Sequence, residues 1–137
     1  MKQITVSAAV ILRTNPQTLK QEILATQRGY GDFKGGWEFP GGKIESGETP
    51  EVCIVREIRE ELATVVKAEK ILGVVEYDYP AFHLTMHCIL CSVVSGDLIL
   101  LEHEDAKWVT WETLYSLDWL PADKLILGKI QEILSAI

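Results

Sequence analysis

The chain has 137 residues, of which 47% are hydrophobic and 24% charged, a balance that excludes a disordered or fibrous protein and predicts a single domain over residues 1–137. Its formal net charge of −7 excludes the basic surface that duplex nucleic-acid binders use. Apolar runs such as 89–94 are far shorter than the roughly 20 residues that span a bilayer. We therefore expect neither a nucleic-acid polymer nor a membrane as a partner.

Two strands are predicted at the start of the chain, over residues 4–13 and 22–28, with a turn-rich segment between them. The N-terminal apolar run alternates like a strand and lacks a small-residue cleavage site. This pattern predicts a cytoplasmic protein.

A helix is predicted after the glycine-rich segment 29–37 and the Pro-Gly-Gly turn at 40–42. Thr49 can cap its first turn and Pro50 suits the first helical position, so the helix should run from there to about Leu62. Apolar residues recur at intervals of three and four and predict a stripe that docks on a sheet. The stripe consists of Val52, Val55, Ile58 and Leu62.

The second half of the chain predicts three more strands and a C-terminal helix. Residues 71–80 and 83–94 form a strand pair around Pro80 and Ala81, and 107–111 form another strand. Residues 120–137 predict a helix, with apolar positions at Leu125, Ile126, Ile130, Ile133 and Leu134. Strands around a central helix, with a terminal helix, predict an α/β sandwich with a mixed sheet.

The three cysteines predict buried thiols rather than a disulfide framework. Cys88 and Cys91 form a C-x-x-C, the spacing of redox and zinc sites, but they lie in a predicted strand. Side chains three apart on a strand point to opposite faces. We therefore favour structural thiols over redox or zinc chemistry.

The predicted central helix carries three close carboxylates, Glu57, Glu60 and Glu61. Residues three and four apart converge on one helix face, and like charges there destabilise the helix unless a positive charge lies among them. Arg56 can offset part of the repulsion through Glu60, and a divalent cation would offset the rest. The alternative is an ordinary solvated face, since glutamate is a good helix former.

The segment before this helix favours a cation site. Gly41 and Gly42 let the backbone approach a ligand closely, beside the acidic helix. Carboxylate and carbonyl oxygens are hard ligands that favour Mg²⁺ or Mn²⁺ over zinc or copper.

The spacing of these residues resembles the signature of the Nudix hydrolase family. Gly42, five residues, Glu48, seven residues and then Arg56-Glu57-Ile58-x-Glu60-Glu61 match the Nudix box. The chain departs from the box at its end, where Ala63 replaces glycine and Thr64 replaces an aliphatic residue. The segments at 37–51, 76–87 and 120–123 resemble the MutT-like branch, which includes 8-oxo-dGTP diphosphatases and CTP pyrophosphohydrolases.

The resemblance implies a Nudix-type α/β/α sandwich and a set of metal ligands. The implied ligands are Glu57, Glu60, Glu61, the carbonyl of Gly41 and a late loop carboxylate matched to Glu102. Glu104 and Asp105 are rivals of Glu102, and a solvated loop without a ligand is the third interpretation. Arg56 is expected to orient the glutamates.

The resemblance also implies an enzyme that uses Mg²⁺, with Mn²⁺ as a possible substitute, to cleave a nucleoside triphosphate into a nucleoside monophosphate and pyrophosphate. Such a small-molecule substrate fits the sanitation of 8-oxo-dGTP or cytidine-type triphosphates from the nucleotide pool. The alternatives are hydrolysis of another nucleoside diphosphate compound and a nucleotide-binding regulator that does not cleave.

Four residues are candidates for nucleotide binding. Arg28 resembles a substrate-binding arginine, or is a solvated strand end. Phe39 and Tyr77 offer aromatic faces, or belong to the core. Asp123 can accept a hydrogen bond from an exocyclic amino group of cytosine, or donate to an oxidised guanine when protonated, or cap the C-terminal helix.

Overall fold

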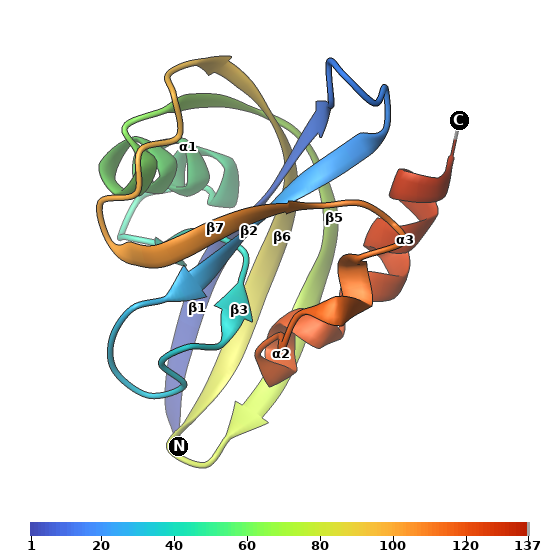
Figure 1. Ribbon diagram of the computed structural model, residues 1–137. Coiled ribbons are helices and arrows are strands. Elements are labelled where there is room, and N and C mark those ends of the chain that lie inside the picture. The colour runs from blue at the N-terminus through green and yellow to red at the C-terminus, as the bar shows by residue number, and fades with distance from the viewer. Residues whose placement is uncertain (137) are drawn as a thin grey trace.

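The computed structural model describes residues 1–136, which form seven strands, three α-helices and one short 3-10 helix (Figure 1). The elements are β1 (Lys2–Thr14), β2 (Gln21–Arg28), β3 (Trp37–Glu38), β4 (Gly41–Lys43), α1 (Pro50–Leu62), β5 (Val65–Tyr79), β6 (Phe82–Ser95), β7 (His103–Val109), the 3-10 helix Leu114–Ser116, α2 (Pro121–Lys124) and α3 (Leu127–Ser135). Within the described residues, none of the helices has the length and apolar character needed to span a membrane.

The sheet is mixed, as the sequence predicts, and β1 is its central strand. The order is β3-β2-β1-β6-β5, with β4 added to β1 and β7 added to β2. Strand β1 runs parallel to β6 but antiparallel to β2 and β4. Its first half pairs with β4 at Val6–Ala8, and its end pairs with β2 at Leu12–Thr14. Strand β4 therefore lies beside the middle of the sheet, directly before α1.

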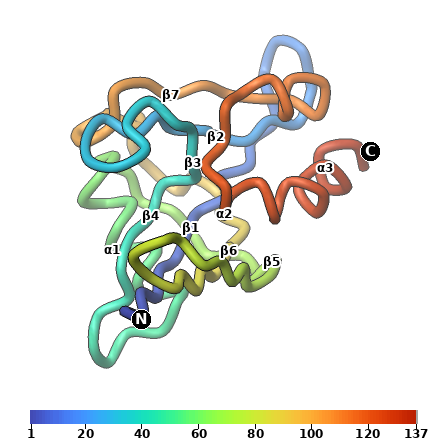
Figure 2. Tube along the Cα trace, turned by 90° about the horizontal axis from the view of Figure 1, so that it is seen from below, coloured from blue at the N-terminus to red at the C-terminus, as the bar shows by residue number. Residues whose placement is uncertain are grey.

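Helices cover both faces of the sheet, which confirms the predicted α/β/α sandwich. Alternate residues of β1 serve opposite faces, because successive side chains of a strand point to opposite sides. Ala8 and Val10 pack in the core that includes Leu127 and Ile130 of α3, whereas Ala9 and Ile11 pack in the core that includes Ile58 of α1. Figures 1 and 2 show α1 and α3 on opposite sides of the strands.

Several strands differ from their predicted bounds. Strand β5 begins at Val65 rather than at 71, and β7 covers His103–Val109 rather than 107–111. The glycine-rich region contains β3 and β4, which the sequence analysis did not predict. Strands of two and three residues are too short to show a two-residue period, so they depend on pairing with β2 and β1.

The predicted C-terminal helix is broken into α2 and α3. The chain turns at Leu125 and Ile126, and the turn buries Ile126 and Leu127 together. Leu125 is 59% exposed, so its assignment to the apolar face was wrong. Ile137, the last residue of the predicted helix, lies outside the described residues.

Helix α1 confirms its predicted bounds but corrects its predicted stripe. Val52 is 56% exposed and Val55 half-buried, whereas Cys53 and Ile54 are buried together with Ile58 and Leu62. The stripe is turned because the start of α1 packs against β4, where the Sγ of Cys53 lies 3.4 Å from the carbonyl oxygen of Lys43.

The prediction of structural thiols for the C-x-x-C pair is confirmed. Cys88 packs in the core on the α3 face and Cys91 in the core on the α1 face. Both are free, and burial raises the pKa of each thiol to about 12.

Candidate active site

Helix α1 is fixed at both ends by local chemistry. Thr49 accepts a hydrogen bond from the amide of Val52 at 3.1 Å, and Pro50 occupies the first helical position. At the other end Ala63 adopts a left-handed conformation, with φ of 50° and ψ of 39°, and its amide donates to the carbonyl of Arg59. The carboxylates of the helix are therefore presented from a rigid frame.

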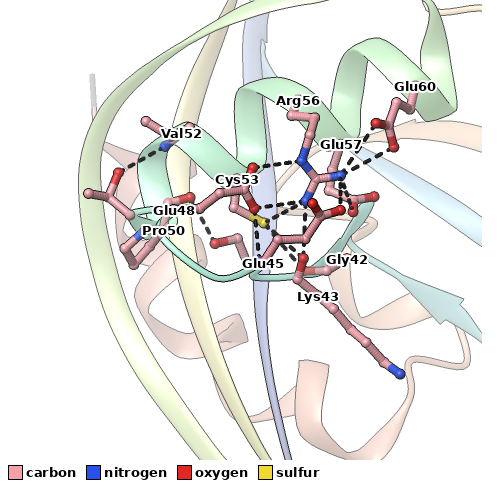
Figure 3. A network of polar contacts seen from close by, with 12 residues as sticks. Gly42, Lys43, Glu45, Glu48, Pro50, Val52, Cys53, Arg56, Glu57 and Glu60 are labelled. Atoms are coloured by element: carbon pink, nitrogen blue, oxygen red, sulfur yellow. Dashed lines mark hydrogen bonds and ion pairs between the residues drawn. The ribbon is translucent and has the colours of Figure 1, made fainter.

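Arg56 ties α1 to the loop before it (Figure 3). Its guanidinium donates to both oxygens of Glu48, at 2.7 and 2.9 Å, and to the carbonyl of Lys43 at 3.2 Å. The same group donates to Glu57 at 2.9 Å and to Glu60 at 3.3 Å, so the predicted pairing with Glu60 is confirmed. The hydrogen bonds from Arg56, with one from the Glu45 amide, lower the pKa of Glu48 to about 2.

Two glycines allow the backbone of β4 to lie against its neighbours. A Cβ on Gly42 would lie 2.4 Å from the Cδ of Glu57, so the carboxylate of Glu57 packs directly on the backbone there. A Cβ on Gly41 would lie 2.0 Å from the carbonyl oxygen of Ser7. Larger residues at either position would displace β4 from β1 or Glu57 from the site.

Glu61 is the most unusual carboxylate of α1. It is 7% exposed, and its Oε2 atom is buried without a hydrogen-bond partner. Burial, together with the charges of Glu57 and Glu102, raises its pKa to about 9. A buried and crowded carboxylate is a poor solvated surface group, so the solvated-face interpretation fails for Glu61.

The donor set fits a divalent cation, because a positive charge there would satisfy the unpartnered oxygen of Glu61 and offset the crowding. The side chains of the described residues are nevertheless not gathered into a ready-made cluster of three or more metal ligands. Glu60 in particular is 57% exposed at its side chain and paired with Arg56.

A cavity of about 220 Å³ lies beside these carboxylates. Its lining brings together residues of β2 and the loop after it, of β3, β4 and α1, and of the start of β7 with the residue before it. They are Arg28, Gly29, Tyr30, Glu38, Gly41, Glu61, Glu102 and His103. Three of the predicted metal ligands, Gly41, Glu61 and Glu102, therefore line the same cavity.

The three late carboxylates differ in their surroundings. Glu102 lines the cavity and acts on the pKa of Glu61. Glu104 lies 3.7 Å from the Nζ of Lys34, and Asp105 accepts a hydrogen bond from the amide of Ala106. Neither rival lines the cavity, so the geometry favours Glu102.

Arg28 joins this cavity to a second one. Its Nη2 and Nε atoms donate to the two carboxylate oxygens of Glu38, at 2.8 and 3.3 Å, and both residues line both cavities. The pairing of β2 with β7 shifts register between Gln27 and Arg28, and such a bulge re-aims the side chains that follow it. Arg28 is thus not a freely solvated strand end.

The second cavity, of about 370 Å³, has largely apolar walls. Phe39 lines it and stacks on Trp119, with ring centroids 4.7 Å apart. Tyr79 also lines it, whereas Tyr77 lines neither cavity and packs its ring against Tyr79 at 4.7 Å. An aromatic-walled cavity of this size suits a planar ring such as a nucleobase.

Asp123 is a buried polar residue in the lining of this second cavity. It is 5% exposed, and its Oδ2 accepts a hydrogen bond from the amide of Phe39 at 3.0 Å. Burial raises its pKa to about 7. The N-cap interpretation was wrong, because Pro121 begins α2 and places the cap at Leu120, which leaves Asp123 inside the helix.

Sequence reasoning missed Glu38, Tyr79 and His103. Glu38 had a usable signal, because in a strand it alternates with Trp37 and Phe39 and must face away from those two buried rings. The side chain of His103 is only 8% exposed, and burial lowers its pKa. No local pattern marks His103, since its surroundings come from α1 and β2.

Comparison with known proteins identifies relatives along most of the chain. The family model described as NUDIX domain matches residues 3–128. The chain is 30% identical over 134 residues to an 8-oxo-dGTP diphosphatase of Escherichia coli (strain K12), covering 97% of this chain and all of the relative. It is also 30% identical over 123 residues to a CTP pyrophosphohydrolase of the same organism, covering 90% of this chain and 87% of the relative.

A solved structure shares the fold. The solution structure of the E. coli ORF135 protein superposes with a TM-score of 0.80 at 29% identity, and the match covers 98% of this chain and 93% of the other.

Proposed function

The chain belongs to the Nudix hydrolases, and from this premise we propose that it is a Mg²⁺-dependent nucleoside triphosphate pyrophosphohydrolase that releases a nucleoside monophosphate and pyrophosphate. The observation that carries the proposal is the buried Glu61 carboxylate, whose unpartnered oxygen lies beside a polar cavity that continues, through Arg28 and Glu38, into an aromatic one. A polar compartment next to an aromatic one matches a triphosphate attached to a base.

Divalent metal use is general in the family, and Mg²⁺ or Mn²⁺ is the ion that the oxygen donors here favour. The residues that would hold it are Glu57, Glu60, Glu61, Glu102 and the carbonyl of Gly41. Bound there, the ion supplies charge neutralisation to the phosphoryl oxygens and lowers the pKa of a coordinated water. A 2.9 Å hydrogen bond from Arg56 to Glu57 supports the role of Arg56 in orienting that carboxylate.

The nucleoside would occupy the larger cavity. Phe39 and Tyr79 supply aromatic walls, and Asp123 supplies the polar contact with the base. Tyr79, rather than the predicted Tyr77, supplies this wall, because the ring of Tyr77 packs against Tyr79 but lines neither cavity. Arg28 lies where the two cavities meet, so its guanidinium is placed between the base and the phosphates.

The base contact leaves two substrate types, cytidine-type triphosphates and 8-oxo-dGTP. Ionised Asp123 accepts from an exocyclic amino group such as N4 of cytosine, and protonated Asp123 also donates. Its pKa of about 7 makes both forms available near neutral pH. Asp123→Asn should therefore change the ratio of kcat/KM between CTP and 8-oxo-dGTP by tenfold or more, because lost hydrogen-bond partners discriminate strongly. An unchanged ratio would remove Asp123 from base selection.

The proposal is tested by Mg²⁺-dependent pyrophosphate release across a panel of nucleotides. Glu57→Gln and Glu61→Gln should each reduce kcat at least a hundredfold, about 3 kcal/mol of barrier, while the fold persists. Glu102→Gln should have a lower kcat but still bind nucleotide. Glu104 is exposed and lies outside the cavity, so Glu104→Gln serves as the matched control and should keep the wild-type kcat.

The same panel separates the alternatives. Release of products other than pyrophosphate from dinucleoside polyphosphates or nucleotide sugars, without triphosphate cleavage, would identify a different Nudix hydrolase activity. Nucleotide binding without any turnover would identify a regulator. Normal turnover by Glu61→Gln would show that the metal assignment is wrong.

A further inference from the structure

His103 enters the polar cavity because of how β7 begins. It is the first residue of β7 and pairs with Arg28 of β2 just beyond a register shift, at which β7 has one extra residue, Glu104. The bulge places His103 and Arg28 side by side on the lining of the cavity. The imidazole is thereby brought to α1, far from it in sequence.

Two polar atoms in this place lack partners. The Nδ1 of His103 and the Oε2 of Glu61 are buried without hydrogen bonds, and the Nε2 of His103 lies 3.9 Å from that same Oε2. An unpartnered buried polar atom destabilises the folded state, so such a pair in a folded enzyme needs a reason. A shortening of about 1 Å would bring Nε2 and Oε2 to hydrogen-bond distance.

The surroundings leave Glu61 as the acceptor that the imidazole can serve. Arg28, its pairing partner on β2, is a donor, and it already donates to both carboxylate oxygens of Glu38, which also lines the cavity. Glu102 is exposed to solvent, whereas the side chain of Glu61 is only 9% exposed and cannot turn outward. Both side chains are packed, so each restricts the orientation of the other.

We propose that His103 is a positioning residue that donates its Nε2–H to Glu61 and holds that carboxylate in the orientation needed for metal binding. The inference rests on the proposed function, because it assigns His103 to the carboxylate that would ligate the ion. Hydrogen bonds to ligating carboxylates are worth 10–100-fold in metal affinity or activity.

The test uses Mn²⁺ as the probe and replaces the imidazole by two amides. The amide nitrogen of glutamine lies near the position of Nε2, and that of asparagine near the position of Nδ1. His103→Gln should keep Mn²⁺ affinity within about threefold, whereas His103→Asn should weaken it at least tenfold, measured by the electron paramagnetic resonance of Mn²⁺ with the nucleotide-free protein. The loss in His103→Asn should appear in kcat, with KM for the nucleotide little changed.

His83→Asn is the matched control. His83 also contacts carboxylates, Asp78 at 2.6 Å and Glu76 at 3.1 Å, but lines neither cavity. The His83→Asn substitution should leave Mn²⁺ affinity and kcat unchanged.

The outcomes separate the inference from the proposed function. If the wild-type protein binds Mn²⁺ and Glu61→Gln does not, the metal site stands. If His103→Asn then binds Mn²⁺ as tightly as the wild type, the role of His103 alone is overturned. A variant with unchanged kcat and Mn²⁺ affinity but a raised KM would also overturn it, because that result would indicate a substrate contact. A wild-type protein that binds no Mn²⁺ would overturn the proposed metal site and the inference together.

Discussion

At the scale of single residues, burial decides what the carboxylates do. Glu48 and Glu61 belong to the same Nudix box, yet Arg56 lowers the pKa of the first to about 2, whereas burial raises that of the second to about 9. The pKa of Asp123 is raised to about 7, with burial as the largest cause. Residue type therefore does not fix the charge state of an acid in this protein.

Asp123→Asn should stabilise the protein increasingly as the pH rises. The folded-state pKa of Asp123, about 7, lies above the usual value of about 4 in an unfolded chain, so the folded state holds the proton more tightly. The corresponding stability is present below pH 4 and is lost as the pH rises through 7. Asparagine keeps an acceptor for the amide of Phe39 but does not ionise. The free energy of unfolding of the variant relative to wild type should rise by about 2–3 kcal/mol between pH 5 and pH 8 in urea titrations.

The exposed Asp118 supplies the control for this pH dependence. Asp118 presents its backbone carbonyl to Trp37, and Asp118→Asn leaves that bond in place. Its stability relative to wild type should not change between the two pH values. A pH-independent difference for Asp123→Asn would mean that the carboxyl is ionised throughout in the folded state.

At the scale of the elements, the exit of α1 is strained. Ala63 has φ of 50°, a conformation in which a Cβ is unfavourable and glycine is not. Ala63→Gly should raise the free energy of unfolding by about 1 kcal/mol without changing kcat, because the left-handed cap keeps its hydrogen bond to Arg59. Chemical denaturation at fixed pH measures the change.

The matched substitution is Ala81→Gly in the turn between β5 and β6. Ala81 is exposed and is not among the residues with positive φ. Glycine there should lower stability by about 0.5 kcal/mol, since it adds freedom to the unfolded chain. If both variants are destabilised alike, the end of α1 carries no backbone strain.

At the scale of the whole molecule, the polar cavity joins elements that are distant in the chain. Arg28 comes from β2, Gly41 from β4, Glu61 from α1 and Glu102 from the segment before β7. An ion held by this set binds the folded chain and not the unfolded one, so it should stabilise the whole domain. Mg²⁺ at a hundred times its dissociation constant should add about 2.7 kcal/mol, visible as a rise in Tm that chelation reverses.

The ion effect should disappear in Glu61→Gln and persist in Glu104→Gln, whose side chain lies outside the cavity. An equal rise in Tm for both variants would show that Mg²⁺ stabilises the protein at some other place.

The sequence by itself determined the features that depend on neighbours along the chain. The bounds of α1, the pairing of Arg56 with Glu60 and the opposite faces of Cys88 and Cys91 follow from helical and strand periodicity, which needs no partner element. The family spacing likewise lies within one short segment, and the mixed sandwich follows from the order of the elements.

Only the tertiary structure decided which side chains meet across the sheet. The contact of Asp123 with the Phe39 amide joins residues 84 positions apart, and the approach of His103 to Glu61 depends on a register shift in the pairing of β7 with β2. The exposure of Val52 and the break before α3 likewise depend on how each helix packs. Such contacts follow from long-range packing, which a local pattern does not encode because many partners satisfy the same periodicity.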